Sequence, residues 1–499
     1  MIRVRFAPSP TGFVHLGSLR TALYNFLFAR NHDGKFILRI EDTDRSRYVE
    51  GATENLLSVL EWAGLVADEG PERGGDYGPY FQSQRTELYI KYANQLVQND
   101  HAYYAFDTPE DIDRKRETVK ASGRSVFKYD ASTRREMVNS LTLPEGKVQD
   151  LLLSGTPHVI RLKIPENQSF EFDDVVRGNV TFASEQVDDT VLVKSDGFPT
   201  YHLANVVDDH LMEITHVIRG EEWLSSVPKH VFLYQCFGWS VPVMAHLPLI
   251  FNPDGSKMSK RSIQSLSDLP GKVDPDVQTY IKAGYEKQAL LNYIALLGWN
   301  PGDDREVFTP EELISNFTLE RVNKSAAIFD LNKLNHINFQ HLSRMNVDEL
   351  TREFKSRLEA EGIDIDSETY LAKVVALLQS RLHFRHEFVD YSRYFFKNPQ
   401  SFDPKVVKKR WKSDSGKLIL EFINEISKLS SFDKHALEDV VHRIAERNEV
   451  GNGRIIHPVR LAVSGVGVGP GLFDMLEVLG EERVIRRLKK AVEILEPQH

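Results

Sequence analysis

The chain has 499 residues, which exceeds what one hydrophobic core normally supports and predicts about three to five domains. Its hydrophobic content of 41% and charged content of 27% are typical of a folded globular protein and exclude a disordered chain. No apolar run reaches the ~18 residues of a membrane span. A net charge of -10 excludes a protein that coats nucleic acid through its overall field, so any such contact must use local basic patches. Candidate patches lie at residues 114–116, 405–412 and 486–490.

The single cysteine, Cys236, excludes an internal disulfide and any zinc site built on two or more thiolates. The first residues, Met1–Phe6, alternate like a strand and do not have the organisation of a secretory signal. We therefore expect a cytoplasmic protein without membrane association, and we expect it to be a monomer.

The N-terminal residues predict a strand, a crossover helix and a second strand. Residues 2–7 alternate, residues 18–30 carry apolar side chains at helical spacing, and residues 35–40 form the second strand. Such a unit implies a parallel sheet, whose ligands bind beyond the carboxyl ends of the strands. Residues 7–15 and 41–44 are therefore candidates for a binding site.

The pattern changes along the rest of the chain. Residues 101–197 read as a polar helical stretch followed by short alternating segments, which indicates an insertion. The α/β pattern returns in residues 190–194, 200–211, 215–219 and 225–237. Beyond about residue 330 the pattern is almost wholly helical, as in residues 371–388, 417–429 and 437–447, which predicts one or two helical bundles.

Two short motifs point to nucleotide chemistry. His15–Ser18 lies where the first strand gives way to a helix, whose N-terminus can bind an anion. Gly17 lets a nucleotide approach the backbone, and His15 can donate a hydrogen bond to a phosphate oxygen. Lys257–Arg261 places three cations on a polar loop, which suits a mobile clamp on polyphosphate because negative charge grows there during nucleotidyl transfer. Each motif alone is weak, but the two together on a split α/β sheet are specific.

These motifs resemble the two signature motifs of class I aminoacyl-tRNA synthetases. Four further segments, residues 5–12, 39–44, 201–205 and 219–223, resemble the bacterial glutamyl-tRNA synthetase family. The resemblance covers essentially the whole chain. It implies an α/β fold with a discontinuous Rossmann-type parallel-sheet catalytic domain, an α+β insertion, and an all-helical C-terminal half that binds the anticodon.

The resemblance also implies a division into domains. The catalytic domain is expected in two halves at residues 1–100 and 198–254, separated by an acceptor-end-binding insertion at 101–197. A stem-contact domain that carries the lysine loop is expected at 255–335. Two helical anticodon-binding subdomains are expected at 336–395 and 396–499.

The expected amino-acid substrate can be compared with the residues directly. Glutamate carries an α-ammonium and two carboxylates, so its pocket needs an acceptor and cations. Glu41 can accept from the ammonium, while Arg5 and Arg219 can divide the carboxylates; which arginine faces which carboxylate is left open. The resemblance implies that the glutamate contacts are Arg5, Ala7, Ser9, Glu41, Tyr201, Asn205 and Arg219.

ATP with Mg2+ is the expected nucleotide, and no protein ligand for the Mg2+ is identified. The resemblance implies that ATP contacts His15, Gly17, Glu222, Trp223, Lys257, Met258, Ser259, Lys260 and Arg261. Catalytic roles are implied for His15, Gly17, Lys257 and Lys260. No general base is required, because the glutamate carboxylate is already a nucleophile and catalysis reduces to alignment and charge stabilisation.

Several residue clusters imitate other sites. Some relatives carry a cysteine zinc site in the insertion, but Tyr103–Phe106 contains no cysteine, so we expect no zinc. His383, His386 and Asp208–His210 suggest metal ligands by residue type alone and lack further ligands at suitable spacing, so we expect no protein metal site. The glycine-rich residues 465–471 fit a loop between C-terminal helices better than a dinucleotide fingerprint, because a proline stands at the third glycine position.

The implied reaction converts glutamate and ATP to glutamyl-adenylate and pyrophosphate, then transfers the glutamyl group to the 3'-terminal adenosine of tRNA(Glu). Contacts to tRNA are expected from Arg45, Arg47, Arg381 and Trp411. Arg381, expected on a helix with residues 378–380, predicts discrimination against tRNA(Gln). An alternative of equal weight is an arginine packed along the bundle with its head in water.

Three other functions compete with this hypothesis. A metabolic nucleotidyltransferase and an enzyme that glutamylates a tRNA base would each lack the helical half. An inactive tRNA-binding paralogue is disfavoured by the intact residues His15, Lys257, Lys260, Arg5 and Glu41. ATP-pyrophosphate exchange with glutamate separates these hypotheses.

Overall fold

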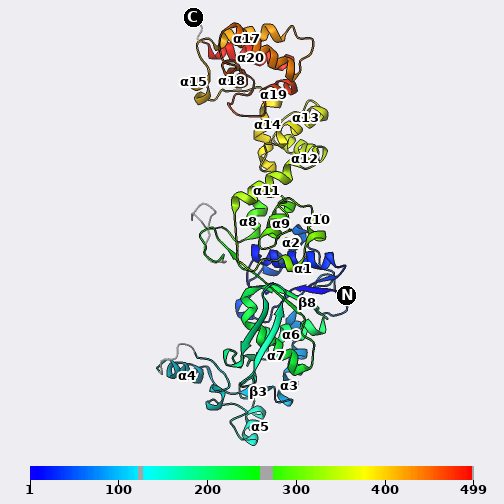
Figure 1. Ribbon diagram of the computed structural model, residues 1–499, viewed down its shortest axis with the longest axis vertical. Coiled ribbons are helices and arrows are strands. Elements are labelled where there is room, and N and C mark those ends of the chain that lie inside the picture. Colours follow the sequence, from blue (N-terminus) through cyan, green and yellow to red (C-terminus); the bar gives the residue numbers. More distant parts are fainter. Residues whose placement is uncertain (122–126, 259–272, 497–499) are drawn as a thin grey trace. The chain divides into compact units, whose positions relative to one another are not determined.

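The computed structural model describes residues 1–121, 127–258 and 273–496 and divides into two compact units. The first unit comprises Met1–Ala283 and Lys287–Lys333, and the second comprises Gly284–Glu286 and Leu334–His499. In Figure 1 the first unit runs in colour from blue to green and the second from green to red.

A six-stranded sheet organises the first unit, in the order β2-β1-β8-β9-β5-β6. Its strands are β2 (Lys35–Leu38), β1 (Arg3–Phe6), β8 (His216–Gly220), β9 (Val243–Leu247), β5 (Ser169–Asp174) and β6 (Gly178–Ala183). Neighbouring strands are parallel except for the antiparallel β5–β6 hairpin. The predicted discontinuous parallel sheet is thus confirmed, with β8 and β9 arriving about 200 residues after β1 and β2. All four residues of β1 are buried, so its arginines need buried partners.

Helix α1 (Leu16–Asn31) is the crossover between β1 and β2. Its buried residues include Leu16, Leu19, Leu23 and Leu27, which recur at helical spacing. It packs against β1 and β8 and against α9 (Lys287–Leu296) and α10 (Pro310–Asn316), which lie beside it in Figure 1. These contacts fix α1 on several sides.

Helix α10 begins with a reciprocal capping box. Thr309 Oγ1 accepts from the backbone N–H of Glu312 at 3.2 Å, and Glu312 Oε2 accepts from the backbone N–H of Thr309 at 2.8 Å. We expect Thr309→Ala to lower the free energy of unfolding of the first unit by about 1 kcal/mol, as measured by urea denaturation. Glu312→Gln keeps an acceptor at this position and should change little. An equal loss in both variants would contradict the capping explanation.

The region expected as an insertion contributes to two sheets. Three of its strands, β3 (Ala102–Ala105), β4 (Val159–Leu162) and β7 (Val191–Val193), form a separate antiparallel sheet. The β5–β6 hairpin instead extends the six-stranded sheet, because Asp174 pairs with Met244 of β9. Its helices are α4 (Pro109–Ala121) and α5 (Glu145–Leu153).

The remaining elements of the first unit complete the surroundings of the sheet. The helices are α2 (Ala52–Ala63), α3 (Thr86–Gln98), α6 (Tyr201–Leu211), α7 (Val227–Phe237) and α8 (Val277–Ala283). A two-stranded parallel sheet pairs β10 (Ile250–Phe251) with β11 (Ala327–Ile328). Short 3-10 helices lie at Arg45–Arg47, Gln82–Arg85, Thr133–Glu136, Ser184–Gln186, Glu221–Ser226 and Leu319–Arg321.

Every regular element of the second unit within its described residues is helical, as predicted. The helices are α11 (Leu331–Ser343), α12 (Val347–Ala360), α13 (Glu368–Gln379), α14 (Phe388–Phe396), α15 (Pro404–Arg410), α16 (Ser415–Ile426), α17 (Lys434–Arg447), α18 (Gly453–Ser464), α19 (Leu472–Leu479) and α20 (Glu481–Leu495). One continuous core of buried aliphatic and aromatic residues joins all of these helices except α15, which packs against α18. Residues 465–471 form the loop between α18 and α19, as expected.

The expected single helix over residues 371–388 is wrong, because two helices and a 3-10 turn occupy this region. Helix α13 ends at Gln379, a 3-10 turn follows at Arg385–Glu387, and α14 begins at Phe388. The Glu387 carboxylate accepts from the backbone N–H groups of His383 and Phe384 at 2.8 and 3.0 Å, which stabilises the break. An apolar period alone does not reveal such a cap.

Candidate active site

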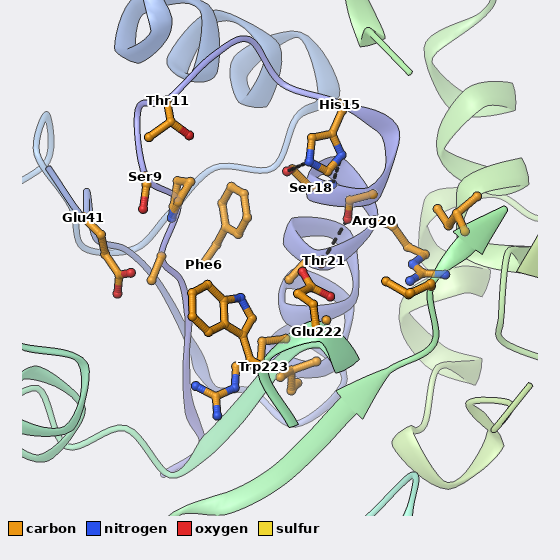
Figure 2. A pocket seen from close by; sticks show the side chains of 18 of the residues that line it. Phe6, Ser9, Thr11, His15, Ser18, Arg20, Thr21, Glu41, Glu222 and Trp223 are labelled. Carbon is orange, nitrogen blue, oxygen red and sulfur yellow. Dashed lines mark hydrogen bonds between the residues drawn. The ribbon is translucent and has the colours of Figure 1, made fainter. Parts of the chain in front are cut away.

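A cavity of about 430 Å³ lies at the carboxyl ends of β1, β2 and β8 (Figure 2). All seven predicted glutamate contacts line it, namely Arg5, Ala7, Ser9, Glu41, Tyr201, Asn205 and Arg219. Six of the predicted nucleotide contacts also line it, namely His15, Gly17, Glu222, Trp223, Lys257 and Met258. Ser259, Lys260 and Arg261 lie outside the described residues. In Figure 2, Glu41 and Ser9 lie toward one side of the pocket and His15 with Ser18 toward another.

A buried network of charges holds the first arginine of the pocket. Arg5 on β1 is 3% exposed, and its Nε donates to Asp209 Oδ1 at 3.0 Å. Arg39 donates to the same oxygen at 2.8 Å and to Glu41 Oε1 at 3.1 Å. Burial raises the pKa of Glu41, while Arg39 and Arg5 oppose the rise. A ligand ammonium beside Glu41 would add another positive partner and favour the carboxylate form.

Helix α6 presents Tyr201, Asn205 and Asp209 at four-residue spacing, so the three side chains lie on one face. The hydrogen-bond network orients the Asn205 amide with its nitrogen 3.3 Å from Asp209 Oδ2 and its oxygen 3.1 Å from Arg39 Nη2. Asp208 and Asp209, which resemble metal ligands by type, are instead paired with arginines. Sequence analysis considered these two adjacent acids only as possible metal ligands and missed that they pair with buried arginines.

Arg219, at the end of β8, has a different environment from Arg5. It donates from Nη1 to the Tyr201 hydroxyl at 2.7 Å, from Nε to His246 Nε2 at 3.0 Å and from Nη2 to His230 Nδ1 at 3.3 Å. Burial lowers the pKa of His246 to about 4 and that of His230 well below its usual range. The second arginine is therefore surrounded by neutral groups, and of these sequence analysis had singled out Tyr201 but neither histidine.

His15 is the N-cap of α1, at the opposite side of the pocket from Glu41 (Figure 2). Its Nδ1 accepts from the backbone N–H of Ser18 at 3.1 Å, and its Nε2 lies 3.0 Å from Ser18 Oγ. A Cβ at Gly17 would lie 3.2 Å from the His15 ring, so glycine lets the ring rest against the start of the helix. The first turn of α1 thus presents a helix N-terminus to the cavity, which is suited to an anion.

The 3-10 helix after β8 supplies an aromatic wall. The Trp223 ring lies on the Tyr201 ring with centroids 4.1 Å apart. The Glu222 carboxylate folds back over Gly220, where a Cβ would lie 2.1 Å from its nearest oxygen. Glycine at position 220 therefore allows Glu222 to face the cavity, as Figure 2 shows beside Trp223.

Arg20 on α1 is a further lining residue that sequence analysis missed. It is buried, donates to the carbonyl oxygen of Leu297 at 2.8 Å and also donates to that of Pro248. Pro248 precedes β10, from which the chain continues to Lys257, whose backbone bridges Phe251. Arg20 thus ties α1 to the base of the lysine loop.

The predicted tRNA contacts do not line the pocket. Arg45 lies over the Phe198 ring at 4.7 Å, and Arg47 pairs with Asp44 at 2.6 Å, both in the first unit. Arg381 is exposed and follows the end of α13, so its expected place on the helix is wrong. Trp411 follows α15 and packs partly buried against the core of the second unit.

A parallel sheet interrupted by an insertion, with a helix N-terminus and a lysine loop around one cavity, is the arrangement of a class I tRNA synthetase. The family described as "tRNA synthetases class I (E and Q), catalytic domain" matches residues 1–336, and "Anticodon binding domain" matches residues 346–492. A glutamate--tRNA ligase of Chloroherpeton thalassium is 49% identical over 508 residues, covering 100% of this chain and 99% of the relative. One of Chlorobium chlorochromatii is 47% identical, covering 99% and 98%. The chain therefore belongs to the bacterial glutamate--tRNA ligase family.

Solved structures agree with this assignment. The crystal structure of a glutamate tRNA ligase from Elizabethkingia meningosepticum in complex with its amino acid has a TM-score of 0.89 and 42% sequence identity, covering 99% of this chain and 100% of that one. The glutamate-tRNA synthetase of Elizabethkingia anophelis has a TM-score of 0.84, also at 42% identity, with 99% of each chain covered. Membership of the class I family implies the use of ATP, typically with Mg2+. None of the helices in the described parts of the chain has the length and apolar character to cross a bilayer.

Proposed function

We propose that this chain activates L-glutamate with ATP and attaches it to tRNA(Glu). The observation that carries the proposal is one cavity that joins Arg5, Arg219 and Glu41 to the N-terminus of α1. Two cations and one carboxylate match the three charges of glutamate, and the helix N-terminus matches a phosphate. The helical second unit fits a tRNA ligase better than the shorter nucleotidyltransferases or a base-modifying enzyme.

The proposed chemistry needs alignment more than acid-base catalysis. The α-carboxylate of glutamate attacks the α-phosphorus of ATP, pyrophosphate leaves, and glutamyl-adenylate forms. His15 and the amides near Gly17 face the phosphates, Trp223 faces the nucleoside, and Lys257 with Lys260 stabilises charge on the departing pyrophosphate. In the second step a terminal ribose hydroxyl of tRNA attacks the activated carbonyl and releases AMP.

Mg2+ is expected to accompany ATP. Among the described residues, no group of three His, Cys, Asp or Glu side chains could hold a metal ion. We therefore assign no protein ligand to Mg2+; bound with ATP, it would neutralise phosphate charge and orient the leaving group. Zinc is not part of the proposal.

Recognition of tRNA is assigned to both units. We assign acceptor-end binding to residues 101–197, stem contact to residues 255–335, and contacts near the pocket to Arg45 and Arg47. Arg381 and Trp411 are assigned to the anticodon. The exposure of Arg381 beyond the end of α13 supports an RNA contact rather than packing along the bundle, and we propose that it makes the enzyme discriminate against tRNA(Gln). The chain is proposed to act in the cytoplasm as a monomer.

Two assays test these proposals. Purified chain should catalyse glutamate-dependent ATP-pyrophosphate exchange in the presence of tRNA(Glu) and should charge that tRNA with glutamate but not with glutamine. Absence of exchange with and without tRNA would overturn the enzymatic proposal. Charging of tRNA(Gln) with glutamate at a rate comparable to tRNA(Glu) would overturn only the proposed discrimination.

A further inference from the structure

Behind the pocket, hydrogen bonds through His246 link the buried carboxylate of Asp174 to Arg219. The carboxylate itself does not contact Arg219. Arg219 is 5% exposed and its Nε donates to His246 Nε2 at 3.0 Å. The other ring nitrogen, His246 Nδ1, lies 2.6 Å from Asp174 Oδ2. Asp174 is the last residue of β5, and His246 is on β9. Neither residue lines the cavity.

The donors in this chain settle the position of the histidine proton. A guanidinium can only donate, so His246 Nε2 must accept and Nδ1 must carry the proton that is given to Asp174. The same reasoning applies to His230, whose Nδ1 accepts from Arg219 and whose Nε2 then donates to His202 Nδ1 at 3.2 Å. Both histidines act as neutral acceptors, in agreement with the burial that lowers their pKa values.

Neutral partners leave Arg219 with its charge uncompensated by direct contact. Arg5, in contrast, contacts the Asp209 carboxylate at 3.0 Å. Of the five N–H groups of Arg219, three are used by His246, His230 and the Tyr201 hydroxyl. Two N–H groups are left, one on each terminal nitrogen, and they can donate to a carboxylate in the cavity that Arg219 lines.

We propose that Asp174 and His246 are positioning residues that fix the tautomer and donor geometry by which Arg219 binds a carboxylate of glutamate. This inference rests on the proposed function, since it takes glutamate as the ligand. Asp174 holds the proton on Nδ1, His246 holds the guanidinium through Nε, and the two remaining N–H groups are left for the carboxylate. If the carboxylate held by Arg219 is that of the side chain, the amide of glutamine would present a donor to one of these N–H groups, and the same geometry would disfavour glutamine.

Asp174→Asn tests the proposal because it reverses the proton position with little change in shape. Asp174 Oδ1 accepts from the backbone N–H groups of Val176, Arg177 and His246 at 3.0, 2.9 and 3.2 Å, so the amide oxygen of asparagine would keep that place. Its NH2 group would then face His246 Nδ1 and donate to it. The ring proton of His246 would then move to Nε2. This N–H group and the Nε–H group of Arg219 would face each other as two donors with no acceptor between them.

The expected result is a selective loss of glutamate binding. In ATP-pyrophosphate exchange, Asp174→Asn should raise the KM for glutamate about tenfold or more while the KM for ATP stays within about twofold of wild type. The single variant His246→Gln, whose amide can accept from Arg219 and donate to Asp174, should retain most of the wild-type affinity for glutamate. His216→Gln, on the same strand as Arg219 but outside the cavity, is the matched control.

Selective 15N labelling of histidine gives a readout that does not depend on activity. The wild-type protein should show His246 as the Nδ1–H tautomer, and Asp174→Asn should show the Nε2–H tautomer. A wild-type Nε2–H tautomer, or an unchanged KM for glutamate in a folded Asp174→Asn variant, would overturn the inference. Failure of wild-type protein to use glutamate would instead overturn the proposed function, so the two failures are distinct.

Discussion

Arg219→Met is expected to reduce kcat/KM for glutamate by a factor of about 30 to several thousand. This factor corresponds to a loss of about 2–5 kcal/mol of transition-state stabilisation. Methionine has a similar length but offers no donor, so a carboxylate of the substrate would be desolvated without a partner. Because Arg219 contacts only neutral groups of the protein, its removal leaves no buried carboxylate without a contacting cation. Folding should therefore be largely preserved.

Steady-state exchange kinetics and thermal melting separate these two effects. Arg305→Met, which removes an exposed arginine paired with Asp303 in the same unit, is the control and should match wild type in both assays. If Arg219→Met kept the wild-type kcat/KM, Arg219 would have no role in glutamate binding. If the variant lost activity only because it unfolded, the melting curve would show it.

Asp208→Asn is expected to cause the largest loss of stability, by about 3–5 kcal/mol of unfolding free energy. Asp208 is 0% exposed and accepts from Arg85 Nε at 2.7 Å, from Gln82 at 2.8 Å and from the Tyr89 hydroxyl at 2.8 Å. Asparagine removes the charge that balances buried Arg85 and turns one oxygen into a donor, which faces other donors.

Urea denaturation measures this loss, and Asp303→Asn provides the control. Asp303 is exposed and paired with Arg305, so its neutralisation should change the unfolding free energy by less than about 0.5 kcal/mol. Equal effects of the two substitutions would contradict the role assigned to the buried network. Asp208 does not line the cavity, so the test measures folding rather than substrate binding.

The features that were predictable from sequence are those specified locally. The apolar spacing in α1 and the alternation in β1 identified the crossover unit, and residues adjacent in sequence identified the His15 and Lys257 motifs. The contact between β5 and β9 was not predictable, because an alternating strand fits the edge of either sheet equally well. The same pairing brings Asp174 to His246, so the residues behind Arg219 escaped detection with it.

The roles of several buried residues were missed for one physical reason. Asp208, Asp209, His230 and His246 are buried polar groups whose partners come from other elements. A sequence shows their type but not their partner, so a buried acid beside an arginine resembles a metal ligand until the fold joins them. The break between α13 and α14 has a similar origin, because it depends on the Glu387 side chain accepting from the backbone N–H groups of His383 and Phe384.

Gly298 shows how far the requirements of the pocket extend behind its walls. Its φ is +102°, and a Cβ there would lie 3.3 Å from Arg20 Nη1 and 3.2 Å from Pro248 Cγ. Any side chain at this position would press on the guanidinium that links α1 to the base of the lysine loop. The spacing between the two nucleotide motifs thus depends on Gly298, which does not line the cavity. A screen for altered nucleotide affinity should therefore find substitutions at position 298 as well as inside the cavity.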